Sequence, residues 1–418
     1  MLSIRTLRAT LALAVVALAV VVVVSPASSA PKASKATTVV IWADKDRVPA
    51  VTKIANLWAQ TKGVTVSVVQ KELGPIREDM KTVQADTAPD VIVGAHDWVG
   101  ELASNGSVVP LFPSKTTLKQ FPAYATDAFS YGIALKKLYG APVALENIAL
   151  VTNTKLAKVP TSFADLEQQA LAVKKQTKAQ VGLSVQQGSG GDAYHMYPLF
   201  SGLCGYIFGT NAAGNLDPSA IGVANAKLLK NAPMIDAWNK AGLIRSSVDS
   251  SISKDLFLKG KTAYFFTGPW NLSDIRKTSG LKIAISGFPD MGTGCKSVPF
   301  LGVQGFMVTK FAATHGVDSF AKDLVSNYIM QPAAQLALAA ANDRFPANTA
   351  AGAQVADKDV KAFGAASVGG VPMPNIPQMA SVWGDLGSAW VRSTKGTGSI
   401  PARRSFIGAQ KSIAQKIG

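Results

Sequence analysis

The chain is poor in the residue types that build metal centres and covalent crosslinks. In 418 residues it has two cysteines, Cys204 and Cys295, and three histidines. The histidines (His96, His195 and His315) show no ligand spacing with either cysteine, so we predict no metal site and no cofactor. The cysteines leave two interpretations open, a disulfide or a pair of buried free thiols.

Long apolar runs are absent after the first residues of the chain. At the start, Arg5 and Arg8 precede an apolar segment at residues 11–24, and small residues follow at 25–30. This order is typical of a secretory signal peptide. We therefore predict that residues 1–30 are a signal peptide.

Two further features of this N-terminus concern anchoring and compartment. Residues 7–24 are about long enough to cross a bilayer, so an uncleaved anchor is the alternative to a cleaved signal. No cysteine follows the apolar segment, so we expect no lipid anchor. The rest of the chain predicts a soluble, exported protein, secreted to the cell surface or the periplasm. In such a compartment an even pair of cysteines favours the Cys204–Cys295 disulfide.

Acidic residues are outnumbered by basic ones, 26 against 42, which gives a formal net charge of +16. Loss of the two arginines of the signal would leave +14. An excess of this size often indicates nucleic acid or an anionic surface as partner. Here the basic residues are scattered, without a dense run interleaved with aromatics. We therefore predict no nucleic-acid partner and interpret the charge as a solvated surface.

Motifs of two common enzyme classes are also missing. The chain has no Gly-x-Ser-x-Gly nucleophile elbow and no phosphate-binding loop. It has no internal repeat and no low-complexity tract. An apolar fraction of 48% with 16% charged residues argues against disorder, so a globular fold is expected.

Hydrophobic patterns predict an α/β fold. Residues 39–42 form a short apolar strand, apolar residues recur at helical spacing over 48–58, and residues 64–68 alternate between apolar and polar. Gly63 is placed to end the helix. A β-α-β unit of this kind predicts open, mostly parallel sheets flanked by helices.

Further elements extend the same pattern along the chain. We expect a helix at 76–85, an extended crossover at 142–151, an aromatic stretch at 194–208, and strands at 91–93, 181–185, 264–266 and 306–308.

Polar side chains follow two of the predicted strands. Asp44 comes directly after the strand at 39–42, and Asp97 and Trp98 come after the strand at 91–93. In open α/β sheets, ligands bind beyond the carboxyl ends of the strands. Short acidic side chains there could accept hydrogen bonds from ligand hydroxyls. The alternative is that both aspartates cap the helices that follow.

A late apolar segment, Met373-Pro374-Asn375-Ile376-Pro377-Gln378-Met379, is stiffened by its prolines and followed by Trp383. Each proline fixes its own φ and pushes the preceding residue out of helical geometry. The segment therefore predicts a rigid, extended loop that leads into a helix. A buried crossover is the alternative.

This segment and five others resemble, in the same order, those of one protein family. The others are Trp42-Ala43-Asp44, residues 90–97 with their Ala-His-Asp ending, residues 142–153, residues 190–198 and Gly268-Pro269-Trp270. The chain is similar in these segments to the maltose- and maltodextrin-binding proteins, the extracytoplasmic sugar receptors of ABC importers. The resemblance implies a two-lobed fold with hinge crossings between the lobes.

The resemblance also implies a set of ligand-binding residues. Sugars bind when aromatic rings stack on their C–H faces while carboxylates take their hydroxyls, so a site needs both kinds of side chain. The set carried over is Asp44, Lys45, Asp97, Glu146, Asp192, Tyr194, Trp270, Met373 and Trp383. Glu146 could instead be a solvated or paired crossover residue, and Trp270 a core tryptophan.

Three positions depart from the family's pattern, which has an aromatic residue at the place of Gly94, a basic residue at Trp98 and an aromatic at Gly384. These departures put the length and orientation of the ligand in doubt. We include Trp98 among the ligand-binding residues because it could replace the stacking surface lost at Gly94. Other aromatic residues (Trp58, Trp238, Trp390, and Tyr197 beside Pro198) are assigned to packing.

The resemblance suggests a division of the chain into a polar leader at 31–38, an N-lobe at 39–145 and 303–350, and a C-lobe at 146–302 and 351–418. The implied function is that of a non-enzymatic, monomeric receptor. It would capture maltose or maltodextrin-type α-gluco-oligosaccharides and deliver them to the membrane permease of an ABC importer.

Other functions remain as alternatives. A receptor for another oligosaccharide such as trehalose would use the same residues. A secreted glycoside hydrolase would need two carboxylates flanking the scissile bond, and no motif places an acid in an apolar, pKa-raising setting. A structural or nucleic-acid-binding protein would need a concentrated basic surface.

Overall fold

The structure is a computed structural model that describes residues 37–132, 135–341 and 343–418. The predicted signal peptide and all but the last two residues of the predicted leader lie outside these ranges. Within them, no helix combines the length and the apolar character needed to cross a membrane.

The first sheet has the strand order β14-β6-β13-β3-β1-β2, with β15 paired to β13. Its strands are β1 (Thr38–Asp44), β2 (Thr65–Lys71), β3 (Val91–Ala95), β6 (Ala141–Glu146), β13 (Phe300–Val308), β14 (Phe345–Pro346) and β15 (Val371–Pro372). The predicted β-α-β unit is confirmed, because β1 and β2 are parallel and α1 (Val48–Lys62) connects them. Gly63 ends α1 in the left-handed conformation, with φ 66°.

The second sheet has the strand order β12-β7-β11-β8. Its strands are β7 (Ala149–Asn153), β8 (Leu183–Val185), β11 (Tyr264–Thr267) and β12 (Ile283–Ser286). β6 ends in the first sheet and β7 begins in the second, so the predicted crossover at 142–151 leads the chain between the sheets. The chain returns through β13, which lies in the first sheet.

The α/β class with two sheets is confirmed, but the sheets are mixed rather than mostly parallel. In the first sheet β1 is parallel to β2 and β3, whereas β13 is antiparallel to both β3 and β6. In the second, β11 is parallel to β8 and antiparallel to β7. An apolar run shows that a strand is buried but not which way it runs. The sequence pattern therefore did not predict that β13 is antiparallel to its neighbours β3 and β6.

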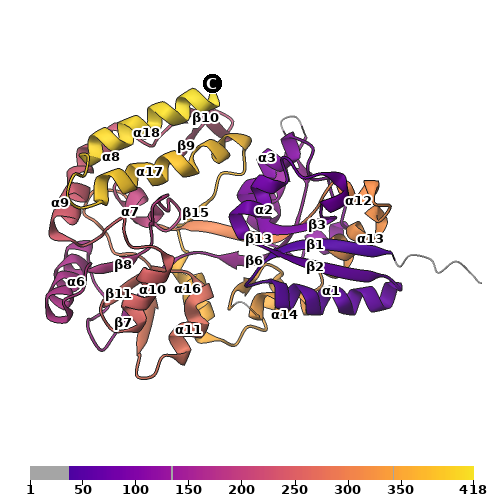
Figure 1. Cartoon of the computed structure of the whole chain (residues 1–418), viewed down its shortest axis with the longest axis horizontal. Coiled ribbons are helices and arrows are strands. Elements are labelled where there is room, and N and C mark those ends of the chain that lie inside the picture. The colour runs from indigo at the N-terminus through magenta and orange to yellow at the C-terminus, as the bar shows by residue number, and fades with distance from the viewer. Residues whose placement is uncertain (1–36, 133–134, 342) are drawn as a thin grey trace, which may run out of the picture. The chain divides into compact units, whose positions relative to one another are not determined.

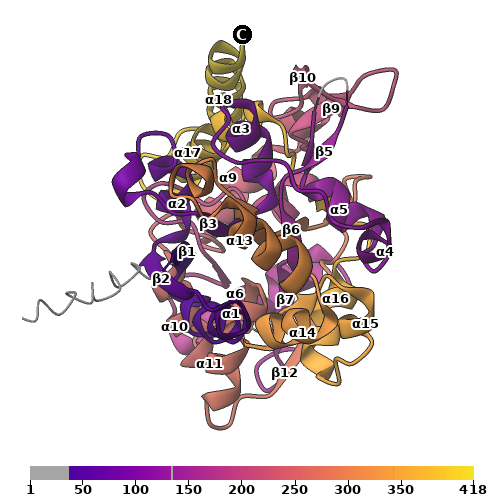
Figure 2. The same cartoon turned by 90° about the vertical axis from the view of Figure 1, so that its right-hand side faces the viewer.

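Helices pack on both sheets, as Figure 1 shows. Those around the first sheet are α1, α2 (Leu73–Asp79), α3 (Val99–Ser104), α4 (Lys115–Leu118), α5 (Ala123–Ala128), α12 (Phe311–Thr314), α13 (Asp318–Asp323), α14 (Pro332–Ala340) and α15 (Thr349–Gly352). In Figure 2, α1 lies beside α14, and the two helices are in contact. The helix predicted at 76–85 is shorter and begins earlier, because Leu73–Asp79 is the helical part.

The second sheet and the C-terminal region hold the remaining helices. These are α6 (Phe163–Thr177), α7 (Tyr197–Gly202), α8 (Ala226–Asn231), α9 (Pro233–Ala241), α10 (Ser250–Leu258), α11 (Leu272–Lys277), α16 (Lys358–Ala366), α17 (Trp383–Thr394) and α18 (Ala402–Ile417). Two hairpins, β4–β5 (Ser130–Tyr131, Lys137–Leu138) and β9–β10 (Phe208–Thr210, Leu216–Ile221), complete the fold. α17 and α18 pack side by side (Figures 1 and 2).

The tryptophans assigned to packing are core residues. Trp58, Trp238 and Trp390 are at most 1% exposed, and Tyr197 is buried beside Phe300 at the start of α7. Trp58 also donates from Nε1 to Asp323 on α13, so its one polar atom is satisfied.

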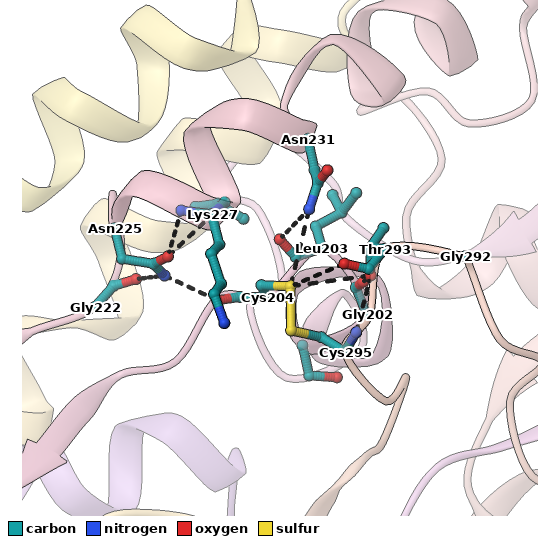
Figure 3. The surroundings of a disulfide bond; sticks show 12 residues. Gly202, Leu203, Cys204, Gly222, Asn225, Lys227, Asn231, Gly292, Thr293 and Cys295 are labelled. Carbon is teal, nitrogen blue, oxygen red and sulfur yellow. Dashed lines mark hydrogen bonds between the residues drawn. A yellow bond between two sulfur atoms is a disulfide. The ribbon is translucent and has the colours of Figure 1, made fainter.

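The predicted disulfide between Cys204 and Cys295 is present, and the alternative of free thiols is wrong. Figure 3 shows it between the turn after α7 and the loop that precedes β13. Asn225 donates from Nδ2 to the Cys204 carbonyl, and Thr293 donates from Oγ1 to Gly202. The crosslink joins positions that are 91 residues apart in the chain.

Removal of this crosslink should lower the free energy of unfolding by about 2–4 kcal/mol, because the unfolded chain regains the freedom of a long loop. Chemical unfolding of the wild type with and without reductant measures the effect. The variant Cys204→Ala/Cys295→Ala is the control. It should unfold at the same midpoint as the reduced wild type, and reductant should not change that midpoint. Identical unfolding midpoints for all samples would show that the disulfide contributes nothing.

Candidate functional site

One cavity of about 630 Å³ contains every side chain that the sequence predicts for ligand binding. We call it the cleft. Its lining includes Asp44, Lys45, Asp97, Trp98, Glu146, Asp192, Tyr194, Trp270, Met373 and Trp383. The structure thus brings together segments that lie up to about 340 residues apart, and their roles in binding stay predictions.

Strand direction explains the first group of cleft residues. β1 and β3 are parallel neighbours, so their carboxyl ends meet at one edge of the sheet. Asp44 is the last residue of β1 and Lys45 follows it, while Asp97 and Trp98 lie in a 3₁₀ turn directly after β3. The cleft therefore lies where open α/β sheets place their ligand sites.

Neither aspartate caps a helix, so the capping alternative is wrong. The N-cap of α1 is Arg47 and that of α3 is Trp98, and no side chain caps either helix. Asp44 instead forms an ion pair with Arg47 and accepts a hydrogen bond from the Asp46 backbone. Both carboxylates remain at the cleft wall.

Asp97 links the first sheet to the start of α17. Its Oδ2 accepts a hydrogen bond of 3.1 Å from Nε1 of Trp383, whose ring also lies edge-on to Phe300. Burial raises the pKa of Asp97 to about 6, against the opposing effects of the Arg77 charge and the Trp383 hydrogen bond. The expectation that no acid sits in a pKa-raising setting is therefore wrong for Asp97.

Glu146 is a paired residue of the crossover, which is the alternative to a ligand-binding role that the sequence left open. Its side chain forms a buried ion pair with Arg344, and Gln304 on β13 donates to Oε1 at 2.6 Å. Burial alone would raise the pKa of Glu146, but the charges of Arg344 and Arg47 with these hydrogen bonds hold it below its usual value. Glu146 lines the cleft as an ionised, oriented carboxylate.

Asp192 is also held by its neighbours. It accepts hydrogen bonds from Nε2 of Gln186 at 2.6 Å and from both the backbone and Nδ1 of His195 at 2.9 Å. Burial by itself would raise the pKa of Asp192, but the contacts with His195 and Gln186 outweigh it and lower the pKa. This carboxylate fixes the Gly-rich turn that carries Tyr194.

Two polar atoms on this turn are buried without a hydrogen-bond partner within the described parts of the chain, the Tyr194 hydroxyl and Nε2 of His195. Nδ1–H of His195 donates to Asp192, which leaves Nε2 as the ring nitrogen without a partner among the described residues. A buried polar atom without a partner costs free energy. Both residues line the cleft, so a ligand with donor and acceptor groups could satisfy them.

The aromatic residues that line the cleft include Tyr194 and Trp270. Tyr194 lies 6.4 Å from Trp270 and 6.2 Å from Phe300 between ring centroids. Arg344 lies over Trp270 at 5.7 Å from the ring centroid. Trp270 is half-buried rather than a core residue, so the core alternative is wrong.

Two tryptophans of the cleft lie against glycines. A Cβ added to Gly94 would come within 1.9 Å of the Trp98 ring, and one added to Gly268 within 2.1 Å of the Trp270 ring. The Trp98 ring thus fills the space in front of Gly94. Trp98 itself is 5% exposed, so its ring offers the cleft a small surface.

The late segment at 373–379 is packed rather than free, and the buried-crossover alternative describes part of it. His96 donates from Nε2 to the Met373 carbonyl at 3.0 Å and accepts at Nδ1 from the Val303 backbone. Burial lowers the pKa of His96 to about 4, so the ring is neutral and suits this pair of bonds. Asn375 donates to three carbonyls, including Ser130. The segment is therefore fixed, with Met373 at the cleft.

Sequence reasoning missed several cleft residues. They are Asp46, Arg47, Glu72, Leu73, Gly74, Arg77, Ala95, Gln186, His195, Ser250, Gln304 and Arg344. Arg47 could have been found, since it lies three residues after Asp44 and opposite charges at that spacing often pair. Arg344 and Gln304 carry no local signal, because their partner Glu146 is more than 150 residues away.

The two-sheet α/β fold with a cleft at the strand ends is that of a two-lobed binding protein. A family model described as bacterial extracellular solute-binding protein matches residues 53–365. This match covers more than half of the chain, and the protein belongs to that family.

Curated relatives point to sugars. The chain is 26% identical to a galactooligosaccharide-binding protein of Bacillus subtilis, with 93% of this chain and 92% of the relative covered. It is 28% identical to the maltodextrin-binding protein MdxE of the same organism, over 79% and 78%. A maltooligosaccharide ABC transporter solute-binding lipoprotein of Streptococcus pneumoniae is 26% identical over 90% and 88%. These relatives are binding proteins, and they are named for oligosaccharides.

The contact between Gly94 and Trp98 predicts the effect of a single methyl group. Gly94→Ala should displace the Trp98 ring, lower the free energy of unfolding by about 1–3 kcal/mol and change the tryptophan emission spectrum. Gly384→Ala is the control, because a Cβ there meets no atom within 4 Å. Equal stability and identical spectra for the two variants would contradict the packing of Trp98 on Gly94.

Asp97 predicts a pH dependence of stability. Its pKa is raised from 3.8 to about 6 by folding, so the folded state favours the protonated form. This contribution to stability is fully present below pH 4 and is lost as pH rises to about 6. Asp97→Asn keeps an acceptor for Trp383 but cannot ionise. The variant should therefore gain stability over the wild type between pH 4 and pH 6, by up to about 3 kcal/mol.

Unfolding of both proteins at a series of pH values measures this difference. His96, whose lowered pKa makes stability fall as pH drops from about 6.5 towards about 4, is present in both proteins and cancels in the comparison. A difference that does not change with pH would show that Asp97 titrates as an ordinary aspartate.

Proposed function

We propose that the protein is the substrate-binding component of an ABC importer, and that it captures maltose or maltodextrin-type α-gluco-oligosaccharides in the cleft. The ligand would then be delivered to a membrane permease. The observation that carries the proposal is the meeting of aromatic rings and oriented carboxylates in one cavity of about 630 Å³. That volume suits an oligosaccharide of a few residues.

The chemistry of the lining supports a carbohydrate ligand. Tyr194 and Trp270 offer ring surface for the C–H faces of a sugar, and Asp44 and Asp97 offer acceptors for its hydroxyls. Hydroxyls both donate and accept, so they also suit the unpartnered Tyr194 hydroxyl and His195 Nε2. A purely apolar or purely ionic ligand would leave one kind of group without a partner.

The sugar is the finer part of the proposal. Relatives named for maltodextrin, maltooligosaccharides and galactooligosaccharides are similarly distant from this chain. We favour the maltodextrin class because the motifs at residues 90–97, 190–198 and 268–270 resemble that family. A receptor for trehalose or for another oligosaccharide is the alternative.

Capture would involve closure of the two lobes, for which we retain the boundaries 39–145 with 303–350 and 146–302 with 351–418. The hydrogen bond from Trp383 to Asp97 joins α17 to the end of β3, so it would form or break as the cleft closes or opens. We further propose that the mature protein is exported, monomeric and free of cofactors. Its partner would be the permease of the importer.

A secreted glycoside hydrolase is the second candidate, favoured by one observation. Burial raises the pKa of Asp97 to about 6, which is a setting suited to a general acid. Against it, Glu146 and Asp192 are held by internal hydrogen bonds with lowered pKa values, and the relatives are binding proteins.

Tryptophan fluorescence of the mature protein, titrated with maltose, maltotriose and trehalose, tests the proposal. At least one sugar should change the emission in a saturable manner. Trp270→Ala should weaken its binding by about ten- to a hundredfold, because a central stacking ring is lost. Phe112→Ala is the matched control, as Phe112 is an exposed aromatic outside the cleft.

The possible results separate the candidates. Equal binding by Trp270→Ala and the wild type would remove Trp270 from the site. If no sugar changes the tryptophan emission and calorimetry detects no binding, the maltodextrin assignment is wrong. Glucose released from the sugar during incubation would favour the hydrolase instead.

A further inference from the structure

The excess of positive charge is concentrated in two segments of the chain, residues 206–245 and 385–418. Together they hold ten basic and three acidic residues, an excess of seven within the chain's +16. These segments make up less than a fifth of the sequence. Basic residues that are scattered along the sequence are therefore gathered where the fold brings the two segments together.

The fold places these two segments side by side. The first contains the β9–β10 hairpin, α8 and α9, and the second contains most of α17 and all of α18. α18 contacts α17, α9 and β10. Nη1 of Arg403 lies 3.5 Å from the Leu229 carbonyl oxygen, and Oε1 of Gln410 accepts from the Ala224 backbone at 2.7 Å. The first half of α18 thus runs along α8, which lies beside it in Figure 1.

α18 buries one side and exposes the other. Its buried residues include Phe406, whose ring packs against Trp390 of α17 at 5.3 Å between ring centroids. Arg403, Ile407 and Lys411 recur at intervals of four residues, so they lie in one row along the exposed side. Ile407 is 45% exposed and is an apolar side chain between two cations of this row.

Exposed cations of α18 and α8 form a surface that we call the basic face. Its members are Arg403, Arg404, Lys411, Lys227 and Lys230. Within the described parts of the chain, none of these five side chains forms an ion pair. The basic face is therefore not neutralised by the protein itself.

The acidic residues of the two segments are engaged elsewhere. Asp217 and Asp236 accept hydrogen bonds from other residues, and Asp385 forms an ion pair with Lys416 near the end of α18. A surface that carries charge of one sign attracts a partner of the opposite sign. The basic face is thus complementary to an anionic partner.

We propose that the basic face docks the protein on a bilayer that contains anionic phospholipids. Lysine and arginine side chains are attracted to such a surface, and an apolar side chain among them can enter the headgroup layer. The basic face and Ile407 offer both kinds of contact. None of these six side chains has an aromatic ring on which bases could stack, so a lipid surface fits better than a nucleic acid.

This docking goes beyond the proposed function and does not depend on the ligand of the cleft. No residue of the basic face lines the cleft, so a sugar could bind while the basic face lies on the membrane. Docking would raise the concentration of an exported receptor at the membrane surface. The attraction is electrostatic, so it should weaken as the salt concentration rises.

Sedimentation of the mature protein with lipid vesicles tests the proposal. An equal mixture of phosphatidylglycerol and phosphatidylcholine should pellet the protein at low salt, whereas phosphatidylcholine alone should leave it in solution. Raising the ionic strength from about 0.01 M to about 1 M should release the protein from the mixed vesicles, because salt screens the charges.

The double variant Arg404→Gln/Lys411→Gln should bind the mixed vesicles about ten- to thirtyfold more weakly, the loss expected for two cations at an anionic surface. Within the described residues neither side chain forms a hydrogen bond or an ion pair, so the fold should be kept. Lys115→Gln/Lys119→Gln is the matched control. It makes the same change of charge at two exposed residues in and directly after α4, and it should bind like the wild type.

A third variant tests the apolar contact. Ile407→Ser keeps every charge of the basic face and should weaken binding to the mixed vesicles by about two- to fivefold. If Ile407→Ser binds like the wild type and single-stranded DNA binds the protein as tightly as the mixed vesicles do, the basic face recognises charge alone and the lipid assignment is wrong.

The remaining outcomes separate docking from the proposed function. Equal pelleting by both kinds of vesicle, or equal binding by Arg404→Gln/Lys411→Gln and its control, would overturn the docking and leave the cleft untouched. Loss of vesicle binding in this variant, with sugar binding unchanged, would support the docking. A wild type that binds the mixed vesicles but no sugar would support the docking and contradict the proposed function.

Discussion

The floor of the cleft depends on one buried ion pair, between Glu146 at the end of β6 and Arg344 just before β14. Both side chains are 7% exposed, and Gln304 on β13 donates to the second oxygen of the carboxylate. A buried pair adds little net stability, but isolating one of its charges costs about 3–5 kcal/mol. The pair therefore acts mainly through geometry, since together with Gln304 it links the end of β6, the middle of β13 and the start of β14. β6 is also the strand from which the chain leaves the first sheet, so one contact positions both the floor and the crossing.

Local sequence patterns predicted those elements of the fold whose signals lie within a few residues of the element itself. The periodicity around Trp42 and Trp58, and the glycine at position 63, defined the first β-α-β unit because each signal lies within a few residues of the element it describes. The aspartates after β1 and β3 followed from the rule that ligands bind at strand ends. Strand direction could not be read, because an apolar run looks the same in both senses. Arg344 was also beyond reach, because its partner lies 198 residues earlier in the chain and a long-range ion pair has no local pattern.

Four of the carboxylates that line the cleft differ in how many hydrogen bonds and ion pairs they form within the protein. Glu146 and Asp192 each accept several internal hydrogen bonds, which orient them and leave fewer lone pairs for a ligand. Asp44 is paired with Arg47, whereas among the described residues Asp97 accepts a side-chain hydrogen bond from Trp383 alone. A ligand hydroxyl approaching Asp97 would meet a carboxylate with spare capacity. Under the proposed function, we expect Glu146 and Asp192 to fix the shape of the cleft and Asp97 to contact the ligand.

The contact of Trp98 with Gly94 limits which substitutions positions 94 and 98 can accept during evolution. The space between these two positions admits one ring, and in this chain position 98 supplies it. A side chain at 94 and an indole at 98 exclude each other, so neither position can change freely while the other stays. Intermediates that carry both side chains, or neither, would be less fit than the two end states. The pair is therefore epistatic, and relatives that carry an aromatic residue at the first position should lack the tryptophan at the second.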